Sequence, residues 1–118
     1  MSDATPGALR LIDLLWHNVR HHPHQVALRI DGKERTFTEL GARVQALAAH
    51  WATSIAPGDR IGLWLHNCHA WVECFLALNA LGAVAVPINT RLTGMELRTL
   101  FELARPHGLV STGHYRRR

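Results

Sequence analysis

Four histidines lie close together near the start of the chain, and their spacing could hold a metal ion. They are His17, His21, His22 and His24. His17 and His21 are four residues apart, so on a helix both imidazoles would share one face. The stretch from His17 to His24 contains no carboxylate or cysteine that would complete such a site. We therefore interpret these histidines as solvated side chains at a helix end and assign no metal ligand.

A second cluster combines a thiol with imidazoles. His66, Cys68 and His69 could form a nucleophile and its base, because an adjacent imidazole can take the proton of a thiol. Neighbours in sequence do not automatically face one another, and no third group that would orient the base is evident. We interpret Cys68 as a packed thiol and assign no catalytic residue. Its spacing from Cys74 matches neither a CxxC pair nor a zinc ribbon, which favours two free thiols in a reducing compartment.

Two asparagines follow predicted strands. Asn67 and Asn89 come just after the apolar segments 60–65 and 84–86. Open α/β sheets bind ligands at the carboxyl edge of their strands, so one reading is a binding role. The reading that we favour is that each short amide hydrogen-bonds the backbone of its own loop. No cofactor-binding residue is assigned.

The elements that would position these groups begin with a helix and a hairpin. Leu11, Ile12, Leu15 and Val19 recur at helical spacing, and Pro23 limits the helix to about three turns. Segments 26–30 and 33–37 then flank Asp31-Gly32, a dipeptide that readily adopts the positive φ angles of a tight reversal. The sequence predicts an antiparallel hairpin there, at the edge of the main sheet.

The rest of the chain alternates between helix and strand. Thr36 with Glu39 and Thr93 with Glu96 stand at capping-box spacing, each before a helical segment. The predicted strands are 60–65, 84–86 and 108–111, and an almost wholly apolar helix, 71–81, ends at Gly82. Connections of this length favour parallel crossovers. The predicted fold class is α/β: the N-terminal part of a doubly wound, mostly parallel sheet with flanking helices and a small hairpin, forming an incomplete domain.

Several short motifs occur in a set order along the chain. They are Thr36-Phe37-Thr38-Glu39-Leu40, Gly58-Asp59-Arg60-Ile61, Asn67-Cys68, the block from Gly82 to Asn89, and Arg91-Leu92 followed by Glu96-Leu97. With them the chain resembles the N-terminal region of the adenylate-forming (AMP-dependent) acyl-CoA synthetases. The resemblance implies a ligase of fatty acid metabolism whose full-length relatives use ATP, magnesium and CoA.

The chemistry of that family is carried by motifs that would lie beyond residue 118. In the relatives a loop rich in Gly, Ser and Thr wraps the ATP phosphates, because a triphosphate needs backbone amides and a cation. In this sequence Ser111-Thr112-Gly113 resembles that loop only weakly. The single lysine, Lys33, lies in the predicted hairpin. No catalytic, cofactor-binding or metal-binding residue of the family can be carried over. The resemblance therefore predicts a truncated N-terminal fragment that is inactive alone.

Length and composition fit one domain of 118 residues with 47% hydrophobic residues. We divide it into a flexible N-terminus (1–8), the N-terminal portion of an AMP-binding domain (9–112) and a basic tail (113–118). Of the 13 Lys and Arg residues, Arg116, Arg117 and Arg118 supply three, so most of the net charge of +4 belongs to that tail. The chain shows neither a signal-peptide core nor an apolar run long enough to span a bilayer, which favours a cytoplasmic protein.

Two other functions stay open at this point. One is a non-catalytic module that self-associates or docks with a separately encoded remainder of the ligase, since Leu109, Val110 and the faces of Val84 and Val86 would lack a cover at the end of the sheet. The other is a small nucleic-acid-binding protein that acts through its arginine tail. The remaining arginines are spread along the chain rather than clustered, which argues against nucleic acid.

Overall fold

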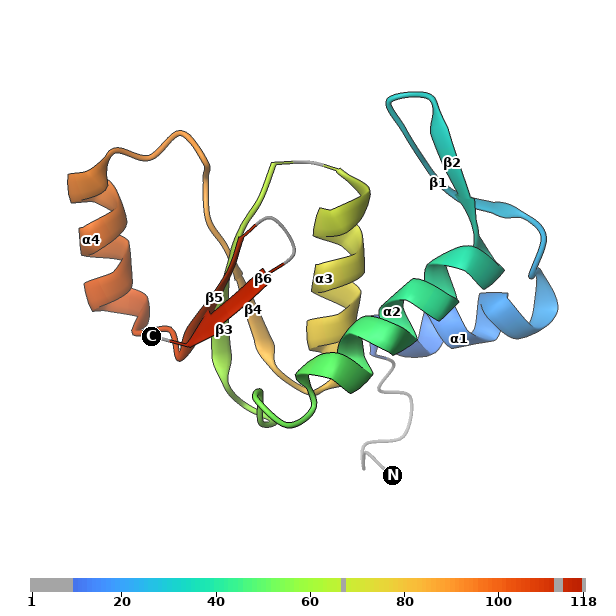
Figure 1. Cartoon of the computed structure of the whole chain (residues 1–118), viewed down its shortest axis with the longest axis horizontal. Coiled ribbons are helices and arrows are strands. Elements are labelled where there is room, and N and C mark those ends of the chain that lie inside the picture. The colour runs from blue at the N-terminus through green and yellow to red at the C-terminus, as the bar shows by residue number, and fades with distance from the viewer. Residues whose placement is uncertain (1–9, 67, 112–113, 118) are drawn as a thin grey trace.

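The computed structural model of the chain describes residues 10–66 and 68–111, and the backbone of residues 114–117. Its helices are α1 (Leu11–His21), α2 (Phe37–Trp51), α3 (His69–Ala80) and α4 (Gly94–Ala104). Its strands are β1 (Val26–Ile30), β2 (Lys33–Thr36), β3 (Arg60–Trp64), β4 (Val84–Pro87), β5 (Gly108–Ser111) and β6 (His114–Arg117). Figure 1 shows their order in space.

The main sheet has the strand order β4-β3-β5-β6. β3 pairs in parallel with both β4 and β5, so the predicted α/β fold with three parallel strands is confirmed. The fourth strand differs from the sequence expectation. β6 lies in the segment that we predicted as a basic tail, and it pairs antiparallel with β5, opposite Leu109 and Val110. β6 thus covers the edge of β5. The sequence pattern did not predict this strand, because backbone hydrogen bonding requires no apolar pattern in the pairing strand.

The hairpin forms where it was predicted, with positive φ at both Asp31 (53°) and Gly32 (76°). Its predicted place at the edge of the main sheet was wrong, since β1 and β2 form a separate two-stranded sheet. α2 starts directly after β2, and the amide of Phe37 donates to the carbonyl of Gln25 at 3.0 Å. These links hold the hairpin beside the helices, at a distance from the four-stranded sheet (Figure 1).

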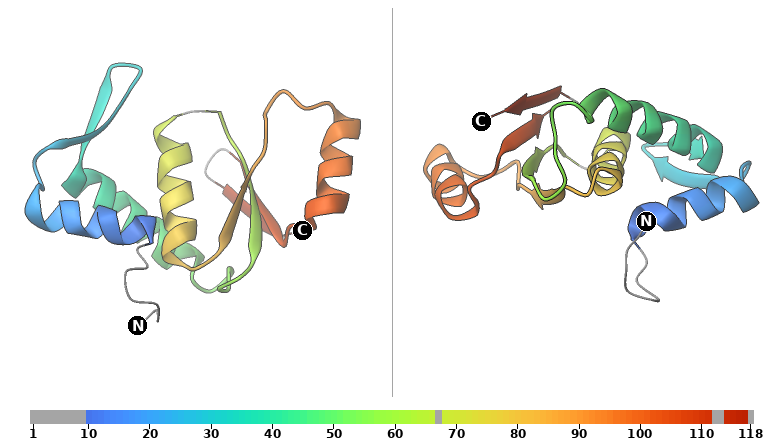
Figure 2. Two further views of the ribbon diagram at one scale, coloured as in Figure 1. Left: turned by 180° about the vertical axis from the view of Figure 1, so that it is seen from behind. Right: turned by 90° about the horizontal axis from the view of Figure 1, so that it is seen from below.

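The helices cover the main sheet unequally. The sheet separates α3 from α4, and α1 and α2 pack on the far side of α3 (Figure 2). The core lies between α3 and the sheet and extends to α1 and α2. Its fully buried side chains include Ile12, Val44, Ile61, Leu63, Cys74, Leu78 and Val110. α4 has no buried residue, and the side chains of Met95 and Leu103 are 81% and 80% exposed.

Both predicted capping boxes are present. The hydroxyl of Thr36 accepts from the amide of Glu39 at 3.2 Å, and the Glu39 carboxylate accepts from the amide of Thr36 at 2.8 Å. Thr93 and Glu96 repeat the arrangement at 3.2 Å and 2.9 Å. The hydrogen bond from the backbone of the threonine lowers the pKa of each carboxyl below its usual 4.5. The start of α2 and of α4 is thereby closed by local interactions.

Acidification should weaken both caps. A carboxyl whose pKa is lower in the folded than in the unfolded chain stabilises the fold above its usual pKa, and this contribution is lost as pH falls through the lower value. We expect the urea midpoint to drop between about pH 5 and about pH 3, with a modest amplitude because both carboxylates are exposed. The double variant Glu39→Gln, Glu96→Gln should show a flatter profile.

Glu102→Gln removes the same charge from an exposed site on α4 outside either cap, and is the control. If the urea midpoint fell with pH by the same amount in the double variant and in the unaltered chain, the assignment of the caps would be contradicted.

Candidate functional site

The motif Gly58-Asp59-Arg60 leads into β3, where it joins several elements. Gly58 has a φ of 85°, and its amide donates to the carbonyl of Gly82 at 2.9 Å. The Asp59 carboxylate accepts from the amide of Ala56 at 3.0 Å. The Arg60 guanidinium donates to backbone carbonyls at the end of α4. The motif thus links the start of β3 to Gly82 and to the end of α4.

A polar pocket of about 390 Å³ opens at the carboxyl ends of β3 and β4. Its lining residues are Leu65, His66, Trp71, Pro87, Ile88, Asn89 and Thr90. The side-chain oxygen of Asn89 accepts from the amide of Arg91 at 2.9 Å, so its predicted role in its own loop is confirmed. Asn67 lies outside the described residues. This is the edge at which open α/β sheets bind ligands, and here the Asn89 side chain serves its own loop.

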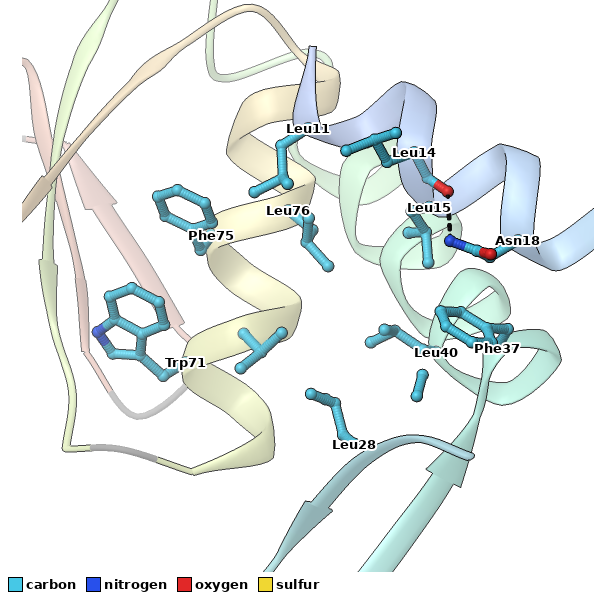
Figure 3. A pocket seen from close by; sticks show the side chains of 12 residues that line it. Leu11, Leu14, Leu15, Asn18, Leu28, Phe37, Leu40, Trp71, Phe75 and Leu76 are labelled. Carbon is cyan, nitrogen blue, oxygen red and sulfur yellow. Dashed lines mark hydrogen bonds between the residues drawn. The ribbon is translucent and has the colours of Figure 1, made fainter. Parts of the chain in front are cut away.

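A second pocket, also about 390 Å³, lies between the hairpin and three helices. Figure 3 shows aliphatic and aromatic side chains from α1, β1, α2 and α3 turned toward it. Asn18 is the polar side chain in its lining, and its amide nitrogen donates to the carbonyl of Leu14 at 3.0 Å. The pocket can bury apolar surface, but it brings together no groups for acid-base or nucleophilic chemistry.

The histidines near the start of the chain lie on and after α1. The rings of His17 and His21 have centroids 4.5 Å apart, and His21, His22 and His24 are exposed. Within the described residues, no group of three or more His, Cys, Asp or Glu side chains is arranged to hold a metal ion.

The cluster of thiol and imidazole groups lies at the start of α3. His69 places its Nε2 3.0 Å from the carbonyl of Lys33, so this imidazole contacts the hairpin. Cys68 precedes α3 and its side chain forms no capping hydrogen bond. Cys74 is buried, and desolvation raises the pKa of its thiol to about 12. Since a thiol with this pKa stays protonated at neutral pH, Cys74 is a packing residue.

Two polar contacts of α3 were not predicted from the sequence. Glu73 is 5% exposed, and its carboxylate accepts from Nε of Arg43 on α2 at 2.7 Å. Asn79 accepts the amide of Ile12 at 2.8 Å and so caps α1 from another helix. A single acidic residue in an otherwise apolar helix was the available signal for the first contact. Both contacts join helices, because each partner comes from a distant part of the chain.

Comparison with known proteins assigns the class of this fold. The model of the AMP-binding enzyme family matches residues 15–117, so the chain belongs to that family. In structure it is similar to the N-terminal subdomain of NpsA from Klebsiella oxytoca in complex with anthranilyl-AMSN, with a TM-score of 0.81 and 26% identity. That match covers 86% of this chain and 27% of the other.

Curated acyl-CoA ligases are similar in sequence. The chain is 38% identical over 87 residues to the 3-[(3aS,4S,7aS)-7a-methyl-1,5-dioxo-octahydro-1H-inden-4-yl]propanoyl:CoA ligase of Rhodococcus jostii, covering 72% of this chain and 17% of that ligase. It is 32% identical over 109 residues to the 3-oxocholest-4-en-26-oate--CoA ligase of Rhodococcus rhodochrous, covering 92% and 20%. The chain thus corresponds to about a fifth of the length of these relatives. In the described part of the chain, no helix has the length and apolar character of a membrane span.

Proposed function

We propose that this chain forms the N-terminal part of an AMP-forming acyl-CoA ligase, an enzyme that joins a carboxylic acid to CoA at the expense of ATP. The observation that carries the proposal is the family match over residues 15–117 together with similarity to ligases of which it spans 17–20%. The parallel sheet and the capped helices α2 and α4 give these residues the role of a scaffold. The location that suits an enzyme supplied with ATP and CoA is the cytoplasm.

The chemistry itself is assigned to residues of the longer enzyme. A triphosphate needs backbone amides and a cation, whereas Lys33 is the one lysine in the sequence and lies at the start of β2. The buried thiol of Cys74 is protonated at neutral pH, and the imidazole of His69 contacts the hairpin. ATP, magnesium and CoA would therefore bind to the full ligase and not to these 118 residues alone.

The isolated chain should show no carboxylate-dependent exchange of pyrophosphate into ATP, because its single lysine, Lys33, lies in the hairpin and no second lysine is present to neutralise a triphosphate. The measurement uses the purified chain with a panel of aliphatic, aromatic and alicyclic acids. A full-length ligase of the family, prepared from the same host, is the positive control. Exchange that follows the chain through a second, different purification would contradict the proposal.

A second proposal concerns the surface of the chain. Several large apolar side chains are exposed: Leu11, Leu14, Val26, Val84, Met95 and Leu103. The chain spans about a fifth of the length of its relatives. We therefore assign these side chains to contacts with the remainder of the ligase, whether it lies on the same or on a separate polypeptide.

Without that remainder, the chain should self-associate as its concentration rises. Sedimentation velocity over a dilution series, with a hydrophobic dye measured in parallel, would record the change in mass and the exposed apolar surface. Met95→Lys with Leu103→Lys should reduce association, and Arg98→Lys on the same helix is the matched control. A dye-silent monomer at every concentration would contradict this proposal and leave the family assignment intact.

A further inference from the structure

The end of α4 is tied to the sheet by hydrogen bonds around two residues. Nε of Arg60 donates to the carbonyl of Ala104, and Nη2 donates to the carbonyl of Arg105, each at 2.9 Å. The amide of His107 donates to the carbonyl of Arg60 at 2.6 Å. The amide of Arg60 donates in turn to Nδ1 of the His107 imidazole at 3.0 Å. β3, α4 and the start of β5 meet at Arg60 and His107.

α4 depends on this junction, because burial of its own side chains contributes little to holding the helix on the sheet. None of its residues is buried, and the cap at its first turn joins Thr93 to Glu96 within the same segment. At its last turn the carbonyls are free of helical partners and attract a cation, which Arg60 supplies from the sheet. Arg105 has a left-handed φ of 48°, which ends the helix there. The side chains of Leu97, Leu100 and Phe101 are half-buried and would lose their cover if α4 moved away.

The imidazole of His107 can accept this hydrogen bond only when Nδ1 carries no proton. In the neutral ring the proton then resides on Nε2. A proton on Nδ1 would place two donors face to face, so protonation and the bond to the Arg60 amide exclude one another.

Two arginines belong to the junction beside His107: Arg60 lies on β3 and Arg105 ends α4. On the β3 side the acidic group is Asp59, whose carboxylate accepts from the amide of Ala56 at 3.0 Å.

We propose that His107 is a pH-sensitive latch for α4. The neutral imidazole fixes the backbone of Arg60, and with it the guanidinium that holds the last turn of α4. On protonation the ring releases the Arg60 amide, and α4 loosens from the sheet and exposes its half-buried side. The change requires no other part of the ligase, so it is independent of the proposed function.

The test compares the chain with the variant His107→Asn. An asparagine side-chain oxygen can accept the same amide proton but does not titrate. Amide hydrogen exchange would be measured at about pH 7.5 and about pH 5.5 and corrected for intrinsic exchange rates. We expect protection at Arg60 and in the last turn of α4 to fall about tenfold or more in the unaltered chain at the lower pH, and to change little in the variant.

His50→Asn replaces an exposed histidine near the end of α2 and should keep the full pH response. An equal loss of protection in the His107 variant, or none in the unaltered chain, would overturn the proposal. The unaltered chain also provides a test that needs no variant. Nitrogen NMR of the His107 ring should show the proton on Nε2 at neutral pH, and a proton on Nδ1 would refute the latch.

Discussion

Replacing Leu78 with alanine is expected to lower the free energy of unfolding by about 2–5 kcal/mol, the usual range for a leucine in a tightly packed core. Leu78 is fully buried on α3, the helix that contacts β3, β4 and both other helices on its side of the sheet. Truncation removes apolar contacts and leaves a cavity that its neighbours can fill only partly. Urea unfolding at a fixed, low protein concentration would measure the loss.

Leu103→Ala is the matched control for this prediction. The Leu103 side chain is 80% exposed on α4, so its truncation should change the free energy of unfolding by less than about 0.5 kcal/mol. Similar values for the two variants would mean that α3 does not occupy the core.

Gly41→Ala should also destabilise the chain, by about 1–3 kcal/mol, although alanine is the better helix former. A β-carbon at position 41 would lie 2.8 Å from Cγ2 of Val19 and 3.4 Å from the ring of Trp16. Val19 is β-branched and restricted at χ1, so it has little freedom to turn aside. The close approach of α1 and α2 therefore depends on glycine at this position, and thermal unfolding would record the change.

Gly94→Ala provides the contrast, because no atom lies within 4 Å of a β-carbon at that position in the first turn of α4. Alanine there should be neutral or slightly stabilising. A stabilising effect at both positions would show that α1 can move away from α2 at little cost.

Not all of the candidate site followed from the sequence pattern. The strands β3 and β4 were predicted because they are recognisable as apolar runs, and a pocket lies at their carboxyl ends, whereas a binding role for this edge stays a prediction. The apolar pocket beside the hairpin was not predicted. It depends on how far α1, α3 and the hairpin stand apart, and that distance is set by side chains from four separate elements. The contacts Arg43–Glu73 and Asn79–Ile12 were missed for the same reason.

The sequence by itself determined the local structure and the family. The capping boxes at Thr36 and Thr93, the Asp31-Gly32 turn and the left-handed Gly82, with a φ of 75°, all involve residues within a few positions of one another. Only the tertiary structure decided where the hairpin lies, that β6 pairs with β5, and that Arg60 and His107 hold the end of α4. The contact between Arg60 and His107 joins residues far apart in the sequence, and the pairing of β5 with β6 rests on backbone hydrogen bonds, so neither leaves a periodic pattern in the chain.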